Sequence, residues 1–186
     1  NGDNSINQLK KIYEYMELPF AVHWYSWWGD FDRDYPHFSP HPETYDVLQK
    51  LKAAGIRVVP YTNGRIWETK DRREEDWQFT SKGLPASVKD IKGKPIIENY
   101  NKASFGVMCP ATKTWKKVIY DIALGLPAFG FDGVYYDQIA AARPRFCYDK
   151  SHGHLLGDHD TWFMRGYYPM FKKSRKDLNQ RYPEAV

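Results

Sequence analysis

Asp137 is the carboxylate in the sequence that is best placed to take part in chemistry. It ends the segment 131–137, whose apolar and aromatic residues give the clearest β-strand signal in the second half of the chain. In parallel α/β folds, ligands bind at the carboxyl ends of the strands, so this acid and the adjacent Gln138 are directed toward a pocket. A structural alternative stays open, in which Asp137 caps the loop that follows it. Asp132 lies at the opposite end of the strand and is predicted to be structural.

A second candidate group lies at the end of an earlier predicted strand, residues 20–28. Alternate residues of a strand share a face, so His23, Tyr25 and Trp27 are predicted to point one way and the residues between them the other way. One set can line a pocket while the other packs beneath helices. The alternative is that these rings belong to the core, because each tryptophan buries a large area.

The segment that follows the next predicted strand, residues 56–61, offers a different set of groups. Asn63 supplies an amide, Arg65 a guanidinium group and Trp67 a flat ring. Donors and ring faces of these kinds are used to bind polyhydroxylated ligands. The pair Asn63-Gly64 is also an ordinary turn signal, so a structural interpretation stays open.

The loop 147–160 holds three of the six histidines of the chain. We predict that His152 and His154 face a substrate and donate hydrogen bonds to it. The alternative is a metal site built from these two residues with Asp158 or His159, and with a cysteine. It is less favoured, because the His-x-His pair of zinc barrels usually sits at a strand end and this pair lies in a glycine-bearing loop. No metal and no cofactor are therefore predicted.

The chain has two cysteines, Cys109 and Cys147, and no CxxC pair. A disulfide between them is geometrically possible if their loops meet. The sequence leaves open whether it forms.

The elements that must position these residues alternate along the chain. Apolar periodicity predicts helices at 5–16, 42–54, 112–125 and 161–178, and strands at 20–28, 56–61, 105–109 and 131–137, with one or two exposed helical turns in the charged run 70–76. This alternation implies parallel pairing, because parallel neighbours need a crossover connection. Carboxylates and aromatic rings follow the strands, and no glycine-rich phosphate-binding turn is present. This favours a barrel with active loops at the strand ends.

Composition and charge narrow the class of protein. A chain of 186 residues with 42% hydrophobic and 27% charged residues is typical of one globular domain, and no run of apolar residues is long enough for a membrane span. The net charge of +4 reflects basic residues at 172–181, but no nucleic-acid-binding motif accompanies them, so no nucleic-acid partner is expected. Aromatic residues make up 17%, more than a small core requires, which points to rings with a function. The chain begins with Asn1, which indicates a processed or excised piece.

A resemblance to known proteins rests on several motifs between residues 20 and 182. They are HWYSWW, FDRDYP, VVPYTNGRIW, MCPATKTWKK, GFDGVYYDQIA and CYDKSHGHLLG. Their succession resembles an uncharacterised family of bacterial glycoside-hydrolase-like barrel domains and, more distantly, retaining α-galactosidases and endo-α-N-acetylgalactosaminidases.

The resemblance implies a (β/α)8 barrel that acts on carbohydrate. Asp137 matches the catalytic nucleophile of the family, and a Glu on the following strand is the acid/base. Retaining cleavage requires two carboxyl groups about 5–5.5 Å apart. The acid/base has no match here, because Glu184 lies at the wrong end of the strand that would follow.

The predicted fold class is therefore α/β, a partial (β/α)8 TIM barrel of about the first four β/α units. Residues 1–186 are the N-terminal portion of an incomplete catalytic domain, whose remainder is expected beyond residue 186 because a barrel typically needs about 250 residues. The predicted function is that of a retaining glycoside hydrolase acting on an oligo- or polysaccharide. Its partners are the carbohydrate substrate and the C-terminal remainder of its own barrel. A secreted or periplasmic location is suspected, and the fragment alone is expected to be inactive.

Asp137 is the predicted catalytic residue, and the predicted substrate-binding side chains form three groups. Trp27 and Trp67 are the sugar-stacking rings. The candidate hydroxyl ligands are Asn63, Arg65, Gln138, His152 and His154. His23 and Tyr25 complete the predicted lining.

Two alternatives stay open. One is a metal-dependent hydrolase or deacetylase that uses the loop with His152 and His154, which predicts tight zinc binding and loss of activity on chelation. The other is a non-catalytic carbohydrate-binding barrel, which predicts sugar affinity without turnover.

Overall fold

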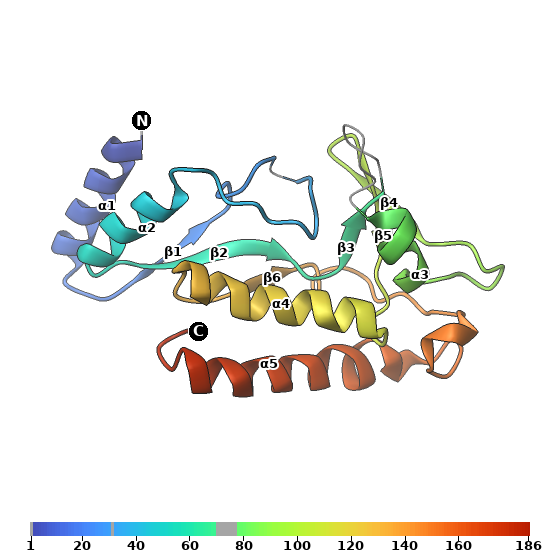
Figure 1. The fold of residues 1–186 in the computed structure, drawn as a ribbon. Helices are drawn as coiled ribbons and strands as arrows, with labels where there is room; N and C mark the ends of the chain where they lie inside the picture. The colour runs from blue at the N-terminus through green and yellow to red at the C-terminus, as the bar shows by residue number, and fades with distance from the viewer. Residues whose placement is uncertain (1, 31, 70–77) are drawn as a thin grey trace.

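The computed structural model describes residues 2–30, 32–69 and 78–186, and it contains two small sheets and several flanking helices (Figure 1). The charged run 70–76 lies outside the described residues, so its helical turns stay a prediction. Strands and helices alternate in the first and last parts of the chain, as the periodicity predicts. A mixed α/β fold is therefore confirmed.

Three strands form a parallel sheet in the middle of the molecule. They are β1 (Ala21–Trp24), β2 (Arg57–Asn63) and β6 (Tyr135–Asp137), in the order β1-β2-β6. Asn63, the last residue of β2, pairs with Asp137, the last residue of β6. Because the strands are parallel, their carboxyl ends meet at one edge, where the polar residues that follow them are brought together.

Helices precede, connect and follow the parallel strands. They are α1 (Gly2–Met16) before β1, α2 (Thr44–Ala53) between β1 and β2, α4 (Lys113–Phe129) before β6, and α5 (Tyr168–Arg181) after β6. α4 and α5 run side by side beneath the parallel sheet in the view of Figure 1. The crossovers that contain α2 and α4 each bring the chain back to the end of the sheet where the strands begin, which is the connection that parallel neighbours need.

The sequence of α4 explains where this helix begins and ends. The side chain of Thr112 accepts a hydrogen bond from the backbone N–H of Trp115 at 3.3 Å, which caps the first turn. Trp115 and Ile119 are buried against the core. The sequence predicts that the helix ends at Gly125, but in the structure it continues to Phe129. Gly130, with φ of 128°, terminates it, because few other residues adopt this backbone conformation.

The segment between β2 and α4 forms a second, antiparallel sheet. Its strands are β3 (Ile66–Glu68), β4 (Ile97–Tyr100) and β5 (Ala103–Val107), in the order β3-β5-β4. The strand expected at 105–109 is therefore real, but its assignment to the parallel sheet is wrong. Only Asn101 and Lys102, both with positive φ, connect β4 to β5, and so short a turn permits antiparallel pairing alone. The described residues contain three parallel strands where about four were expected.

Short helices complete the described structure. They are a π-helix at Phe79–Gly83, α3 (Leu84–Ala86), 3₁₀ helices at Lys150–His152 and His159–Thr161, and a π-helix at Phe163–Tyr167 that leads into α5. Among the described residues, no helix has both the length and the apolar character needed to cross a bilayer.

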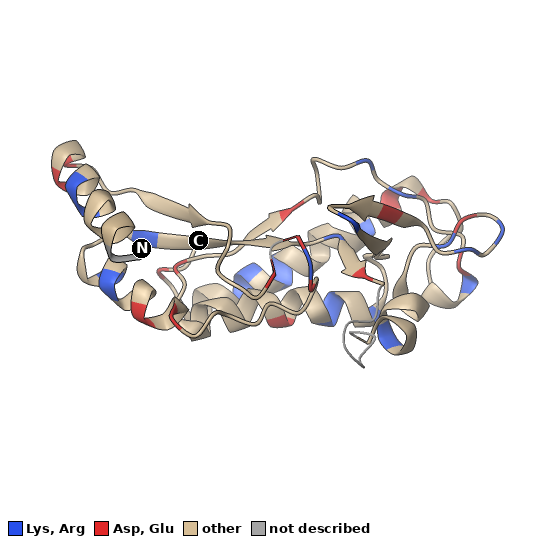
Figure 2. Cartoon of the chain, turned by 90° about the horizontal axis from the view of Figure 1, so that it is seen from above, with Lys and Arg blue, Asp and Glu red and all other residues tan. Residues whose placement is uncertain are grey.

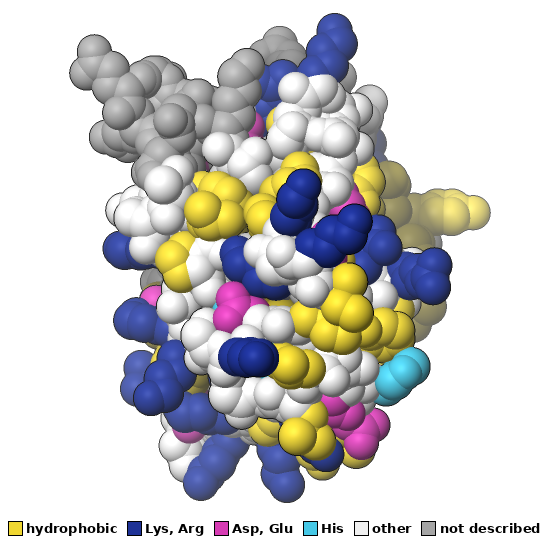
Figure 3. Space-filling view, turned by 90° about the vertical axis from the view of Figure 1, so that its right-hand side faces the viewer, with side chains coloured by type: hydrophobic (Ala, Val, Ile, Leu, Met, Phe, Trp, Pro, Cys, Tyr) yellow, Lys and Arg dark blue, Asp and Glu magenta, His cyan; other side chains and the backbone are white. Residues whose placement is uncertain are grey.

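Charged side chains are interspersed over the described surface. Figure 2 shows basic and acidic residues mixed along the helices and loops. Figure 3 shows one side of the molecule, where Lys and Arg are scattered among apolar and uncharged groups. On α5, Lys172, Lys173 and Arg175 are exposed, and Lys173 pairs with Asp177 at 2.7 Å. The basic residues of α5 thus form a solvated helix face, as expected.

Tryptophan rings make up much of the core. Among the described residues, five tryptophans are buried: Trp27, Trp28, Trp67, Trp115 and Trp162. The aromatic excess therefore serves packing to a larger extent than the sequence suggested, because a buried ring removes a large apolar area from water.

Candidate functional site

The carboxylate of Asp137 is held by two tyrosine hydroxyl groups. The hydroxyl of Tyr61, on β2, donates a hydrogen bond of 2.8 Å to Oδ2 of Asp137. The hydroxyl of Tyr135, on β6, donates a longer one of 3.5 Å to Oδ1. The side chain of Asp137 is partly exposed, so both oxygen atoms are fixed while the group stays within reach of a ligand.

Strand register explains why these three side chains meet. Tyr61 pairs with Tyr135, and two residues further along each strand Asn63 pairs with Asp137. Residues two apart in a strand point to the same face of the sheet. The sequence therefore places two tyrosines one step behind the carboxylate, on the same face.

Two further aromatic side chains extend this face. The ring of His23, on β1, lies 4.4 Å from the ring of Tyr135 and 4.6 Å from the ring of Tyr25. The ring of Tyr25 stacks on that of Tyr61 with the centroids 4.9 Å apart. We call His23, Tyr25, Tyr61, Tyr135 and Asp137 the Asp137 face. Tyr25 is 47% exposed and Tyr135 is 40% exposed, so flat rings lie open beside a fixed carboxylate.

The surroundings of Tyr61 and His23 favour the uncharged form of both side chains. Burial raises the pKa of Tyr61, and the hydrogen bond to Asp137 also raises it, so this phenol stays a donor at all ordinary pH values. Partial burial lowers the pKa of His23, and the charge of Asp137 opposes that shift only in part. The lowered pKa favours the neutral ring of His23, which can donate or accept a hydrogen bond.

The two tryptophans predicted to stack on a sugar lie in the core. Trp27 is fully buried, and its Nε1 donates a hydrogen bond of 2.8 Å to the carbonyl oxygen of Tyr61. β1 ends at Trp24, so the alternation that groups Trp27 with His23 does not reach it. Trp67 is also buried, with its ring 6.2 Å from that of Trp115.

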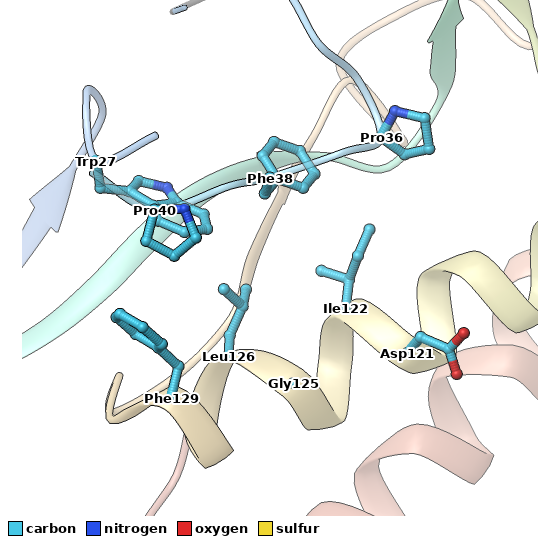
Figure 4. Close-up of a pocket in the computed structure, with 9 residues that line it drawn as sticks. All are labelled: Trp27, Pro36, Phe38, Pro40, Asp121, Ile122, Gly125, Leu126 and Phe129. Carbon is cyan, nitrogen blue, oxygen red and sulfur yellow. The ribbon is translucent and has the colours of Figure 1, made fainter. Parts of the chain in front are cut away.

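Trp27 also lines an apolar groove beside α4. The groove lies between the segment 36–40 and the helix, and Figure 4 shows Phe38, Leu126 and Phe129 around it. Asp121 is its one acidic lining residue, and its side chain points away from the labelled rings in Figure 4. The groove therefore lacks the set of polar groups that a sugar needs.

Asn63 and Arg65 are engaged in structural interactions. The side-chain oxygen of Asn63 accepts hydrogen bonds from the backbone N–H groups of Arg65, at 2.9 Å, and Ile66, at 3.2 Å. Arg65 is buried and forms a two-point ion pair with Glu98, at 2.5 and 2.9 Å. Hydrogen bonds from Arg65 are the main cause that lowers the pKa of Glu98 to about 2. Both side chains therefore hold the local fold, and their predicted role as hydroxyl ligands stays a prediction.

Gln138 keeps the features of a ligand-binding residue. It directly follows Asp137 and adopts a left-handed conformation with φ of 65°, which costs energy for a residue other than glycine. Among the described residues, its buried Oε1 atom has no hydrogen-bond partner. A buried acceptor without a partner is uncommon in native structures.

His152 and His154 form a cluster with the two cysteines. Sγ of Cys147 lies 3.3 Å from Nδ1 of His152, and Sγ of Cys109 lies 3.4 Å from Nε2 of His154. The other nitrogen of each ring contacts a backbone carbonyl oxygen, at Pro85 and Leu155 respectively. Each ring thus contacts a thiol with one nitrogen and a carbonyl oxygen with the other, and the role of hydroxyl ligand predicted for both histidines stays a prediction.

The cysteines of the cluster are free thiols. A hydrogen bond from Cys109 is the main cause that lowers the pKa of Cys147 and raises that of Cys109. Asp158 and His159, which sequence reasoning also considered as metal ligands, are not in the cluster; Asp158 instead pairs with Arg165 at 3.1 Å.

Comparison with family models gives the identity of the chain. The model described as "Domain of unknown function (DUF6259)" matches residues 1–185. The chain belongs to this family. The DUF6259 domain therefore includes both the Asp137 face and the cysteine–histidine cluster.

One curated protein similar to this DUF6259 domain has a name that refers to glycoside hydrolysis. A protein of Monosiga brevicollis named "Putative glycoside hydrolase 22789" is 26% identical over 197 residues, which cover 96% of this chain and 16% of that protein. The resemblance to glycoside-hydrolase-like domains is thus confirmed, and the chain spans about one sixth of the length of that relative.

Solved structures share the fold. The α-N-acetylgalactosaminidase NagBb of Bifidobacterium bifidum, in complex with GalNAc, superposes with a TM-score of 0.71 at 11% identity, over 97% of this chain and 28% of that one. The α-galactosidase AgaA of Geobacillus stearothermophilus gives 0.64 at 10% identity, over 100% of this chain and 25% of that one. The DUF6259 domain thus has the fold of about a quarter of these enzymes.

Sequence reasoning missed two members of the Asp137 face. Tyr61 and Tyr135 carry a usable signal, since each lies two residues before a polar strand-end residue and thus shares its face. For the cysteine–histidine cluster, the usable signal is that one cysteine, Cys147, lies close in sequence to the pair His152 and His154, while the other cysteine of the chain, Cys109, lies in a separate segment.

Proposed function

We propose that this domain contributes the nucleophile and part of the sugar-binding surface of a glycoside hydrolase. The single observation that carries the proposal is the carboxylate of Asp137, fixed by Tyr61 and Tyr135 at the carboxyl end of β6, beside open aromatic rings. Pyranose rings pack their C–H faces on aromatic rings, and their anomeric carbon is attacked by a carboxylate. The names of the relatives agree with this chemistry.

The reaction would proceed with retention. Asp137 would attack the anomeric carbon and form a glycosyl-enzyme, while a second carboxyl group about 5–5.5 Å away protonates the leaving oxygen. The hydroxyl of Tyr61 would hold Oδ2 of Asp137, which orients Oδ1 for attack. Tyr25 would supply a stacking face for the sugar ring.

The hydrogen bonds of the Val186 backbone indicate where the second carboxyl group would come from. Its N–H donates to the carbonyl oxygen of Asp132, and its carbonyl oxygen accepts from Val134, both at 3.0 Å, as in a parallel pair. A strand that ran on from Val186 would lie beside β6, and its carboxyl end would lie next to Asp137. We infer that the acid/base residue comes from that strand of a (β/α)8 barrel, of which this chain is the first part.

The substrate we propose is an α-galactoside or an α-N-acetylgalactosaminide. The structural neighbours include enzymes named for each of these activities. Both substrates present the same pyranose ring and differ at C2, so the Asp137 face could serve either.

The test uses the full-length protein and p-nitrophenyl α-glycosides of galactose and N-acetylgalactosamine. Asp137→Asn should lower kcat by roughly 10⁴-fold, because the nucleophile is lost, while the exposed control Asp46→Asn on α2 should leave it unchanged. With Asp137→Gly, added azide should enter the vacated space and yield the β-glycosyl azide. Normal turnover by Asp137→Asn, or sugar binding by the wild type without any turnover, would overturn the proposal.

A further inference from the structure

Four side chains with metal-ligating atoms converge outside the Asp137 face. Cys109, Cys147, His152 and His154, here called the Cys-His cluster, each offer one ligand atom, and all four atoms lie within 4.8 Å of one another. The two closest sulfur–nitrogen distances are 3.3 and 3.4 Å. Both cysteines are buried and both histidines are partly buried, so the cluster is shielded from bulk water.

The outer contacts of the histidines leave the cluster-facing nitrogen atoms free to bind a cation. Nε2 of His152 lies 2.8 Å from the carbonyl oxygen of Pro85, and Nδ1 of His154 lies 2.9 Å from that of Leu155. A carbonyl oxygen only accepts, so the proton of each neutral ring lies on these outer nitrogen atoms. The inner nitrogen of each ring then presents a lone pair to the cluster, the arrangement found around metal-bound histidines.

The backbone around the cluster is fixed by hydrogen bonds. The N–H of Cys109 donates to Ala86 at 3.0 Å, and the carbonyl oxygen of Cys147 accepts from Gly157 at 2.9 Å. Between the two histidines, Gly153 has φ of 73°, which turns the chain so that both rings reach the same point. The four ligand atoms are thus held together before any ion binds.

We propose that the Cys-His cluster binds one Zn²⁺ ion in tetrahedral coordination. Zinc bond lengths of about 2.3 Å to sulfur and about 2.0–2.1 Å to nitrogen place neighbouring sulfur and nitrogen ligands about 3.6 Å apart. The two distances of 3.3 and 3.4 Å are close to that value, so only small side-chain movements are needed.

The donor set selects zinc over other cations. Two thiolates and two imidazoles are soft and borderline ligands that suit Zn²⁺, whereas Ca²⁺ and Mg²⁺ prefer oxygen. An iron–sulfur cluster with two cysteines and two histidines spreads its ligands over two irons. All four ligand atoms here lie within 4.8 Å, which fits a single ion.

The ion would have a structural role that is separate from glycoside cleavage. Four protein ligands fill a tetrahedral shell and leave no open position for a water nucleophile, which disfavours the alternative of a metal-dependent hydrolase. The ion would join Cys109, between β5 and α4, to the loop 147–154 that follows β6. It would thereby fix the loop downstream of Asp137 against the inserted antiparallel sheet.

Metal analysis of the purified full chain tests the proposal. The protein, after exchange against metal-free buffer and addition of Zn²⁺, should retain one zinc per chain. Cys147→Ser and His154→Gln should each weaken zinc binding by more than about 100-fold in competition with a chelator, because even outer contacts of such sites are worth roughly 10–100-fold. The control His159→Gln changes an exposed histidine of the same loop and should bind zinc as the wild type does.

Two further measurements keep the outcome decisive. Co²⁺ in place of zinc should give the visible bands of a tetrahedral ion and a thiolate-to-cobalt charge-transfer band, and the latter should weaken in Cys147→Ser. Circular dichroism of His154→Gln shows whether that variant is folded, so that lost binding is not mistaken for lost structure. Absence of zinc from the folded wild type, a disulfide between Cys109 and Cys147 in freshly purified protein, or equal binding by all variants would overturn the proposal.

Discussion

The hydroxyl group of Tyr61 donates a hydrogen bond of 2.8 Å to Oδ2 of Asp137 across the boundary between β2 and β6. The phenol ring is almost fully buried, so the donor is held in place by the core rather than by solvent. Burial also raises the pKa of Tyr61, so the donor stays protonated at every ordinary pH. One strand thus positions the carboxylate that another strand carries.

Tyr61→Phe should impair catalysis while leaving substrate binding almost unchanged. The ring and its packing on Tyr25 are retained, and only the donor to Asp137 is lost. A hydrogen bond to a charged acceptor is worth about 1.5–3 kcal/mol, so we expect kcat to fall by about 10- to 100-fold with KM changed less than about 3-fold. Steady-state kinetics of the full-length protein on aryl α-galactosides measures both. A fall in kcat/KM that comes only from KM would show that Tyr61 does not position the nucleophile.

Tyr25→Ala should weaken sugar binding without unfolding the domain. Tyr25 is 47% exposed and stacks on Tyr61 with one face, so the other part of its ring is available to a pyranose. We expect KM to rise by roughly 10-fold, since an aromatic contact is worth about 0.5–1.5 kcal/mol beyond its buried area. Kinetics and thermal unfolding are compared with those of Tyr15→Ala, which removes a ring that is 90% exposed on α1. If the two variants bind sugar equally well, Tyr25 is no stacking residue.

The sequence predicts the position of Asp137 well, because strand-end placement follows from local signals and from the rule that parallel strands share an edge. It predicts the position of Trp27 poorly, because β1 ends at Trp24, three residues before Trp27, and the alternation that would place this ring on the face of His23 stops there. The role of Arg65 depends on Glu98, which lies 33 residues away and reaches it only through the antiparallel sheet. No local pattern reveals such a partner.

The Cys-His cluster shows the same limit. The His-x-His pair is visible in the sequence, yet its meaning depends on where Cys109 comes to lie. That position is set by the end of β5 and by a hydrogen bond to Ala86, both of which are tertiary. A metal site built from two segments can be recognised from sequence only as one alternative among several.

Glu98→Gln should destabilise the domain at neutral pH. Glu98 neutralises the buried Arg65, and removal of its charge leaves a buried cation without a counter-charge. Breaking such a pair costs about 3–5 kcal/mol. Urea unfolding at pH 7 measures the free energy, with Glu14→Gln, an exposed change on α1, as the control. A loss below about 1 kcal/mol would mean that water screens this pair.

The same ion pair predicts a dependence of stability on pH. The pKa of Glu98 is lowered from 4.5 to about 2 in the folded chain, so the fold favours the ionised form. Its contribution to stability is complete above pH 4.5 and is lost as the pH falls toward 2. The difference in unfolding free energy between wild type and Glu98→Gln should therefore shrink over that interval. Urea titrations at several pH values test this, and a constant difference would contradict it.

Gly133→Ala should destabilise the edge of the parallel sheet at which Val186 pairs with β6. A Cβ atom at residue 133 would overlap with the carbonyl oxygen of Val186, which accepts a hydrogen bond from Val134. Relief of that overlap must break the pairing, and overpacking of this kind costs about 1–3 kcal/mol. The control is Gly125→Ala in α4, where nothing lies within 4 Å of the added methyl group and alanine favours the helix by about 0.5–1 kcal/mol. Thermal unfolding should therefore move in opposite directions for the two variants. A shift of Gly133→Ala to higher temperature would show that the backbone of Val186 does not pack against β6.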